Sequence, residues 1–372
     1  MIKTQNNFDF DEKIKYPELV RKYLNQDDLV LTIETTGLSP ERHRIISFSA
    51  ARFDKKSPDT VNTLTYFSEN KDDELEVIES ALGEIKGASR IITWNGASFD
   101  LKFLSKRCEV YAKKLDYNNS SVKIGGEEKH LYDLSKLLHP IRRSIRDESL
   151  SIYTLLEEMG LSDTTLPDGR TVTMLYKTWE KTDEKKYAEP IIDHSVYKLT
   201  GIINLLSLLN CLRITKVKPE ITEVTTETGH KITFTSSNKN NVKFEPSDSK
   251  KAAAFVGTDS ECITVSGTTD IFAPIPLAFA LPGIHLTFTG STFTCIFDTK
   301  GGRIRIYYTD AASYVRIKES GQLIPKELAG TMSKDSYEKV TRETCYTLSA
   351  LPEDESKAKK QLESYIRQLV LM

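Results

Sequence analysis

The sequence predicts an α/β domain over residues 1–213 and, after a linker at 214–218, a β-rich (α+β) domain over residues 219–372. Short β-branched runs alternate with helix-like segments as far as residue 213, which is typical of an α/β layout. From Thr222 to Tyr308, threonine, valine, isoleucine and phenylalanine dominate between polar turns, which indicates strands. A chain of 372 residues is long enough for two ordinary domains.

The first domain begins with two adjacent strands, predicted at residues 29–33 and 45–53 around a turn rich in Gly, Ser and Pro. Between residues 72 and 86, apolar positions recur every three or four residues, which predicts a helix. A third strand is expected at 90–94. Further helices are predicted at 99–114, 149–159 and 190–212.

The second domain has its clearest predicted element at residues 295–308, a hairpin around a Lys-Gly-Gly turn. Arg303 and Arg305 alternate with isoleucines there; they could bind phosphate, but alternating charges usually mark the solvated face of a hairpin. Polar turns are expected at 236–241 and 257–260. A helix at 356–371 closes the chain.

The composition limits the possible partners. Fifty-one basic and 53 acidic residues nearly cancel, so any nucleic-acid surface must be local. The densest basic cluster of the first domain, at Arg142, Arg143 and Arg146, suits either a phosphate backbone or a solvated face. The five cysteines have no zinc or redox spacing. With no secretory signal and no apolar run long enough to cross a bilayer, we expect no membrane association and a cytoplasmic location.

The segment from Thr32 to Leu38, at the end of the first strand, contains Glu34. It resembles the first motif of the DEDD (DnaQ-like) 3′–5′ exonucleases, in which an Asp and a Glu two residues apart project from one strand. Residues i and i+2 share a strand face, so two carboxylates at this spacing can hold metal ions together. Here Glu34 is retained, but Thr32 fills the Asp position, and its neutral hydroxyl is a weaker ligand.

Residues 95–104 resemble the second motif of the same family, placed between a strand and a helix. Asp100 would be a further acid directed at the metals, and Phe99 and Phe103 would pack or stack on nucleotides. Residues 130–134 resemble the strand that commonly follows. Asp133 in that strand is more often a structural acid than a ligand.

The last motif gives the most particular resemblance and also departs furthest from its pattern. Residues 191–198 resemble the His-Asn-x-x-Asp helix of the YprB-like ribonuclease H-like domains, a bacterial branch of the group, and segments 149–161 and 167–179 support that branch. The resemblance implies a mixed sheet flanked by helices. His194 matches the family His, whereas Ser195 replaces the Asn and Lys198 replaces the catalytic Asp.

These replacements argue against metal-dependent hydrolysis. Four acids hold two divalent cations about 3.5–4 Å apart in such sites. With Thr32 and Lys198, the site loses two negative charges and gains a positive one. An ammonium 4 Å from a carboxylate interacts by on the order of 4 kcal/mol at intermediate dielectric. Lys198 could therefore replace a metal ion, although a solvated lysine is the other interpretation, and we expect an inactive or very weak nuclease.

The leading hypothesis is a nucleic-acid-binding protein descended from a 3′–5′ exonuclease. The resemblance implies single-stranded DNA or RNA ends as ligands, and the residues around the terminal nucleotide would be Thr35, Thr36, Leu38, Asn95 and Phe99. His194 is either a general base or, as we favour, a satisfied core or surface His.

Two alternatives stay open. An active divergent exonuclease would need Mg²⁺ or Mn²⁺ at Glu34 and Asp100, with coordination restored by Asp133, Asp193 or another acid. A structural or assembly protein would use the old fold as an interaction platform and hold a protein partner through the β-rich domain.

Overall fold

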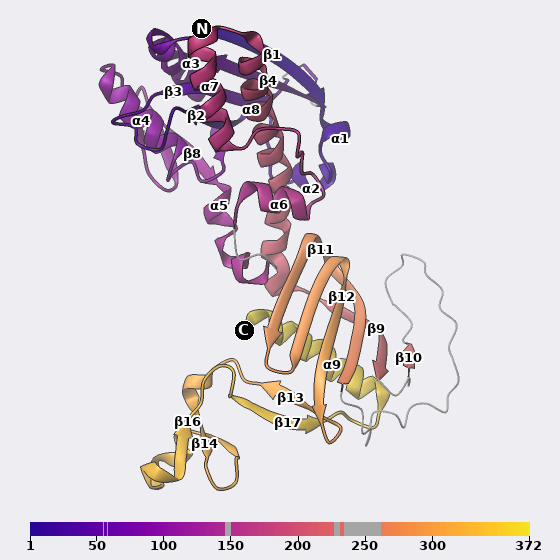
Figure 1. The fold of residues 1–372 in the computed structure, drawn as a ribbon. Coiled ribbons are helices and arrows are strands. Elements are labelled where there is room, and N and C mark those ends of the chain that lie inside the picture. Colours follow the sequence, from indigo (N-terminus) through magenta and orange to yellow (C-terminus); the bar gives the residue numbers. More distant parts are fainter. Residues whose placement is uncertain (55, 58, 146–149, 227–230, 234–261) are drawn as a thin grey trace. The chain divides into compact units, whose positions relative to one another are not determined.

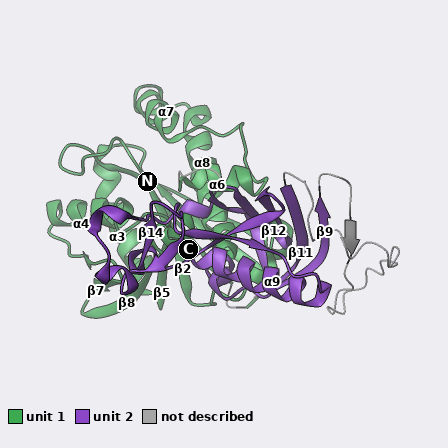
Figure 2. Ribbon diagram, turned by 90° about the horizontal axis from the view of Figure 1, so that it is seen from below, with its two compact units in different colours: residues 1–142, 149–209 green, residues 143–148, 210–372 purple. Residues whose placement is uncertain are grey.

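The computed structural model describes all residues except 55, 58, 146–149, 227–230 and 234–261. The chain forms two compact units (Figure 2): residues 1–142 with 149–209, and residues 143–148 with 210–372. The boundary at 209–210 lies four residues before the predicted linker. Residues 214–216 of that linker continue a 3-10 helix, η3 (Leu206–Lys216), and Pro219 begins the next strand.

The first unit is built on an eight-stranded mixed sheet with the order β1-β4-β3-β2-β5-β8-β7-β6 (Figure 1). Strands β2, β5 and β8 are parallel neighbours, and the other pairs are antiparallel. The strands are β1 (Ile2–Asp9), β2 (Asp28–Thr35), β3 (Ile45–Phe53), β4 (Thr60–Phe67), β5 (Arg90–Thr93), β6 (Asp116–Tyr117), β7 (Ser121–Ile124) and β8 (Glu127–Asp133).

Helices cover both faces of this sheet. On one face, α3 (Glu74–Lys86) and α4 (Asp100–Val110) enclose a core that includes Ile78 and Phe103. On the other, α7 (Gly169–Thr182) and α8 (Lys185–Leu205) pack Tyr176 and Ile191 against the strands. Short helices α1 (Phe10–Lys13), α2 (Pro17–Val20), α5 (Leu134–Leu137), η2 (His139–Ser144) and α6 (Ile152–Glu158) complete the unit, with η1 (Lys71–Asp73) preceding α3.

The predicted mixed sheet flanked by helices is confirmed, with some differences at helix ends. The helix predicted at 99–114 ends at Val110, and Ala112 then takes a positive φ of 53°, which helix continuation forbids. The helix predicted at 190–212 begins earlier, at Lys185, and α8 gives way to η3 after Leu205. The helix predicted at 149–159 is observed as α6, from Ile152.

The second unit is predominantly antiparallel, which confirms the predicted β-rich region. Its main sheet has the order β10-β9-β11-β12-β13-β17, and a small sheet has the order β15-β14-β16. The strands are β9 (Pro219–Thr226), β10 (Lys231–Thr233), β11 (Cys262–Leu281), β12 (Ile284–Lys300), β13 (Arg303–Tyr307), β14 (Tyr314–Ile317), β15 (Leu323–Pro325), β16 (Tyr337–Lys339) and β17 (Tyr346–Ala350), with short helices η5 (Ala311–Ser313), η6 (Leu328–Thr331) and η7 (Lys334–Ser336).

The long β11–β12 hairpin folds back on itself, since the Gly283 carbonyl at its tip accepts a hydrogen bond of 2.9 Å from the Asp298 amide. Register shifts in β11 beyond Thr268 provide the bend. The predicted 295–308 hairpin is confirmed: Gly301 and Gly302 both have positive φ in its turn. The terminal helix is α9 (Glu355–Leu371). The turns predicted at 236–241 and 257–260 lie outside the described residues.

The expectation that no apolar run is long enough to cross a bilayer is corrected: one helical run, Lys185–Lys216, is long and apolar enough by length and composition. However, 72% of its most apolar window is buried inside the protein, as in the core helix of a globular domain. The run thus contributes to packing within the described structure.

Candidate functional site

The candidate site lies at the end of β2. This strand is buried along its whole length, and its alternate side chains point to the same face. Thr32 and Glu34 share that face. Asp100, the first residue of α4, is anchored to this strand: its Oδ1 accepts hydrogen bonds from the Ile33 amide at 2.9 Å and the Thr32 hydroxyl at 3.2 Å. The structure therefore brings the first two motifs together.

Helix α8 brings Lys198 to the same place. Its Nζ lies 2.7 Å from Glu34 Oε1, and the two side chains are 18% and 10% exposed. Burial alone would lower the pKa of Lys198, but the carboxylates of Glu34 and Asp100 outweigh burial and raise it. Lys198 is therefore charged at neutral pH, and the inward salt bridge, rather than a solvated lysine, is what the structure shows.

Asp100 has the opposite balance. Burial raises the pKa of its carboxyl, and this effect exceeds the lowering by Lys198 and by the hydrogen bond from the Ile33 amide. With both acids ionised, Glu34, Asp100 and Lys198 together carry a net charge of −1. A site with a net negative charge disfavours the binding of another anion close to the two carboxylates.

His194 completes the cluster from the same helix. Its Nε2 lies 3.5 Å from Glu34 Oε1 and 3.3 Å from the Tyr153 hydroxyl, and only 1% of its side chain is exposed. Burial lowers the pKa of His194 more than the nearby Glu34 raises it, so the imidazole is neutral at pH 7. His194 is thus a buried residue, but its Nδ1 has no hydrogen-bond partner among the described residues, so it is not the satisfied histidine favoured from the sequence.

The donors present do not fit a pair of divalent cations. Asp100 Oδ1 is occupied by two protein donors, and the Lys198 ammonium contacts Glu34 directly. Within the described part of the chain, no group of three or more His, Cys, Asp or Glu side chains could hold a metal ion. Oxygen-rich coordination of Mg²⁺ or Mn²⁺ would need carboxylates where Thr32 and Lys198 stand.

The two acids considered as substitutes do not rebuild the coordination. Asp133 accepts hydrogen bonds from the Asn95 amide at 2.8 Å, the Ala97 amide at 3.1 Å and the Ser135 hydroxyl at 2.9 Å, so it fixes the loop between β5 and α4. Asp193 is exposed, whereas His194 beside it is buried. Asp133 is thus the structural acid expected from the sequence.

The residues expected around a terminal nucleotide differ in accessibility. Thr35 is buried, and its hydroxyl donates to the Gly37 carbonyl at 2.8 Å. Thr36 accepts a hydrogen bond of 3.0 Å from the Arg44 amide. Leu38 is 85% exposed. Of these three, Leu38 alone presents a large free apolar surface.

Asn95 and Phe99 lie in the second motif segment. Asn95 is exposed and has a φ of 58°, a left-handed conformation that Asn tolerates better than most residues. Phe99 is partly buried, and its ring centroid lies 5.8 Å from that of Phe103. Phe99 therefore packs on the α4 core and leaves only part of its ring accessible.

Tyr153 is a member of the site that was assigned no role from the sequence. It lies on α6, is 39% exposed and contacts His194 through its hydroxyl. Because Tyr153 and His194 lie on separate helices, the spacing of residues along the sequence does not predict this contact. The only available signal was that Tyr153 belongs to a segment supporting the family resemblance.

The basic side chains singled out from the sequence have different environments. Arg142 and Arg143 are exposed in η2, whereas Arg146 lies outside the described residues. In the second unit, Arg303 is exposed, and the Arg305 guanidinium lies over the Tyr346 ring, 5.6 Å from its centroid. Arg305 is thus partly engaged in packing.

Residues 29–210 match the family model of the RNase_H superfamily. The first unit has a ribonuclease H-like fold. The mixed sheet, the flanking helices and the cluster at the end of β2 are the parts of this ribonuclease H-like unit that carry the site. The matched range stops one residue into the second unit, so the β-rich region lies beyond it.

A solved structure, the family B DNA polymerase from the hyperthermophilic archaeon Pyrobaculum calidifontis, is similar over 54% of this chain and 32% of the polymerase chain. The sequence identity is 12% and the TM-score 0.36. This chain thus corresponds to about a third of the length of that polymerase. No curated protein matches the sequence.

Proposed function

We propose that this chain is a nucleic-acid-binding protein whose exonuclease-like domain, of the DEDD type and the YprB-like branch, no longer carries out metal-dependent hydrolysis. The observation that carries the proposal is the Lys198 Nζ contact of 2.7 Å with Glu34 Oε1. An ammonium at this position neutralises a carboxylate that an active site would use for a metal ion.

The proposed ligand is the 3′ end of a single strand of DNA or RNA. Leu38 supplies an exposed apolar side chain four residues beyond Glu34, where a terminal base can stack. The net charge of −1 on Glu34, Asp100 and Lys198 would repel a terminal phosphate. We therefore expect a 3′-hydroxyl end to bind more tightly than a 3′-phosphate end.

The test is fluorescence anisotropy with 5′-labelled single-stranded DNA and RNA in the presence of EDTA. We expect binding without metal, and Leu38→Ala should weaken it by roughly fivefold or more, since stacking contributes about 1–3 kcal/mol per base. Val110→Ala, which removes another exposed apolar side chain from the same unit, is the matched control and should have little effect.

Absence of oligonucleotide binding by the native chain would contradict the proposal and favour the interaction-platform alternative. Binding that requires Mg²⁺ or Mn²⁺ would instead favour an active divergent enzyme. Equal binding of 3′-hydroxyl and 3′-phosphate ends would contradict the assigned position of the strand end.

A further inference from the structure

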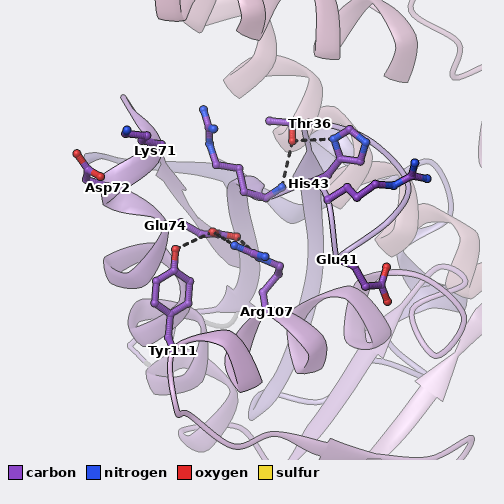
Figure 3. Close-up of a pocket in the computed structure, with 10 residues that line it drawn as sticks. Thr36, Glu41, His43, Lys71, Asp72, Glu74, Arg107 and Tyr111 are labelled. Carbon is purple, nitrogen blue, oxygen red and sulfur yellow. Dashed lines mark hydrogen bonds and ion pairs between the residues drawn. The ribbon is translucent and has the colours of Figure 1, made fainter.

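A cavity of about 430 Å³ opens beside the segment that follows Glu34 (Figure 3). Three parts of the first unit line it: the loop from Thr36 to Arg44, the segment from η1 to Glu74 at the start of α3, and Arg107 and Tyr111 at the end of α4. The cavity therefore begins two residues beyond the candidate site.

One wall of the cavity is held rigidly by Glu74, whose side chain is 1% exposed. Its Oε1 accepts from the Ile45 amide and from Arg107 Nε, each at 2.8 Å, and its Oε2 accepts from the Tyr111 hydroxyl at 2.9 Å. Figure 3 shows the Arg107 and Tyr111 side chains converging on the Glu74 carboxylate. Because Glu74 and Arg107 neutralise each other, neither determines the charge offered to a ligand.

Two other cations that line the cavity, Arg42 and Lys71, are not neutralised in this way. Arg42 and Lys71 are exposed, and within the described structure neither side chain has a hydrogen-bond or ion-pair partner. Arg44 is paired with Glu180 through Nη2, but its buried Nε has no hydrogen-bond partner among the described residues. The cavity therefore presents unsatisfied positive groups from two different elements.

Nearby lysines extend this positive surface along α4. Glu41, at the rim, accepts a hydrogen bond of 2.7 Å from the Ser39 hydroxyl. This bond, and then Lys102 and Lys106, lower the pKa of Glu41. Lys106 is paired with Glu109, whereas Lys102, two residues beyond Asp100, is exposed. Asp72 and Glu41 also line the cavity and balance Arg42 and Lys71 in formal charge, so the surplus positive charge comes from Lys102.

We propose that Arg42, Lys71 and Lys102, here called the basic strip, bind the phosphodiester backbone of a nucleic-acid strand whose 3′ end lies at the Glu34 site. This inference rests on the proposed function. The three cations come from three separate elements, a loop, η1 and α4, which suits successive phosphates better than one small anion.

The test measures the affinity for a labelled single-stranded oligonucleotide as a function of salt concentration, for the native chain and for Arg42→Ala/Lys71→Ala. Each lost phosphate contact should reduce the slope of log K against log salt by about 0.7 for a single strand. Two lost contacts therefore reduce the slope by about 1.4. If the variant and the native chain bind equally at 1 M salt, the variant should bind roughly 25-fold more weakly than the native chain at 0.1 M salt.

Lys22→Ala/Lys86→Ala is the matched control, because it removes two exposed lysines from the same unit. Lys86 ends α3, at the opposite end of this helix from Lys71. The control should keep the native slope. All four substituted side chains are exposed, so the thermal midpoints of both variants should equal that of the native chain.

The outcomes separate the two proposals. If the native chain binds and the Arg42→Ala/Lys71→Ala slope equals that of the control, the basic strip is wrong while the proposed function stands. If the native chain does not bind any oligonucleotide, both are wrong. Binding of inorganic phosphate would be measured for the same two proteins. If Arg42→Ala/Lys71→Ala loses phosphate binding but binds the oligonucleotide as the native chain does, the inference is also wrong, because the cavity then binds a small anion.

Discussion

Lys198 determines the chemistry of the site at the end of β2 by pairing with Glu34. A lysine ammonium supplies positive charge next to Glu34, as a metal ion would, but it activates no water and offers a single charge. Thr32 makes a second contact of this kind, since its hydroxyl donates to Asp100 at 3.2 Å. Lys198 and Thr32 thus give Glu34 and Asp100, respectively, a partner from within the protein.

We predict that Lys198→Met lowers the free energy of unfolding by about 3–5 kcal/mol, because it leaves Glu34 unpaired in a mostly buried position. The pKa of Lys198 is raised, so its contribution is complete below the ordinary lysine pKa of about 10.4 and disappears only as pH rises through the higher folded-state value. The loss should therefore be constant between about pH 6 and pH 9.

Urea unfolding measures this loss, and Lys198→Met/Glu34→Gln is the control. Removing the unpaired charge should recover a large part of the stability, which a double-mutant cycle with Glu34→Gln reports as coupling. Strict additivity of the two substitutions would show that the observed contact contributes nothing.

His194 provides a test in the acidic range. Burial lowers its pKa, so below about pH 6.5 the unfolded chain binds more protons at this residue than the folded chain does. The free energy of unfolding should then fall as pH decreases, by at most about 1.4 kcal/mol per pH unit from this group. In His194→Gln, stability should fall less between pH 7.5 and pH 5.5, as measured by urea unfolding at both values. A steeper fall in the variant would contradict the neutral buried imidazole.

At the level of elements, the β5–α4 loop determines where Asp100 lies. Asp133 at the end of β8 accepts two amide hydrogen bonds from this loop, and Gly96 within it approaches Thr93 closely. A Cβ at Gly96 would lie 2.4 Å from Thr93 Oγ1 and 2.5 Å from Thr93 Cβ. Position 96 is thus limited to glycine, because any Cβ there would overlap the Thr93 side chain at atoms close to the Thr93 backbone.

Gly96→Ala should lower the free energy of unfolding by about 1–3 kcal/mol, the usual cost of overpacking. Gly83→Ala is the matched control. Gly83 lies within α3 and a Cβ there meets nothing within 4 Å, so alanine should raise stability by up to about 1 kcal/mol. Thermal unfolding compares the two, and equal effects of the same sign would refute the crowding at Gly96.

The elements differ in how far they could be predicted. Helix α3 was predicted because its apolar positions have regular helical spacing, and β2 and β3 because they are apolar and β-branched. Strand β1 was not predicted: it is polar, and it is a strand because it pairs along β4. Helix α7 was not predicted either, although Val172, Tyr176 and Trp179 have helical spacing, because threonines weaken its helix propensity.

At the level of the whole molecule, the change from α/β to β-rich composition predicted the division into two regions. The position of the boundary was less predictable, because the apolar run of α8 continues through η3 without a turn signal. The pairing of Lys198 with Glu34 could be proposed from the motif positions. The Tyr153–His194 contact and the basic strip depend on tertiary packing and were not predicted.

The central claim is that the metal site has been replaced by an internal ion pair, and degradation of 5′-labelled single-stranded DNA and RNA with Mg²⁺ or Mn²⁺ tests it most directly. The native chain, Asp100→Ala and Thr32→Asp/Lys198→Asp would be assayed together. We predict no cleavage by the native chain and metal-dependent cleavage by the double variant, which would have four acids at the site. Cleavage by the native chain that Asp100→Ala abolishes would contradict the claim and identify an active divergent exonuclease.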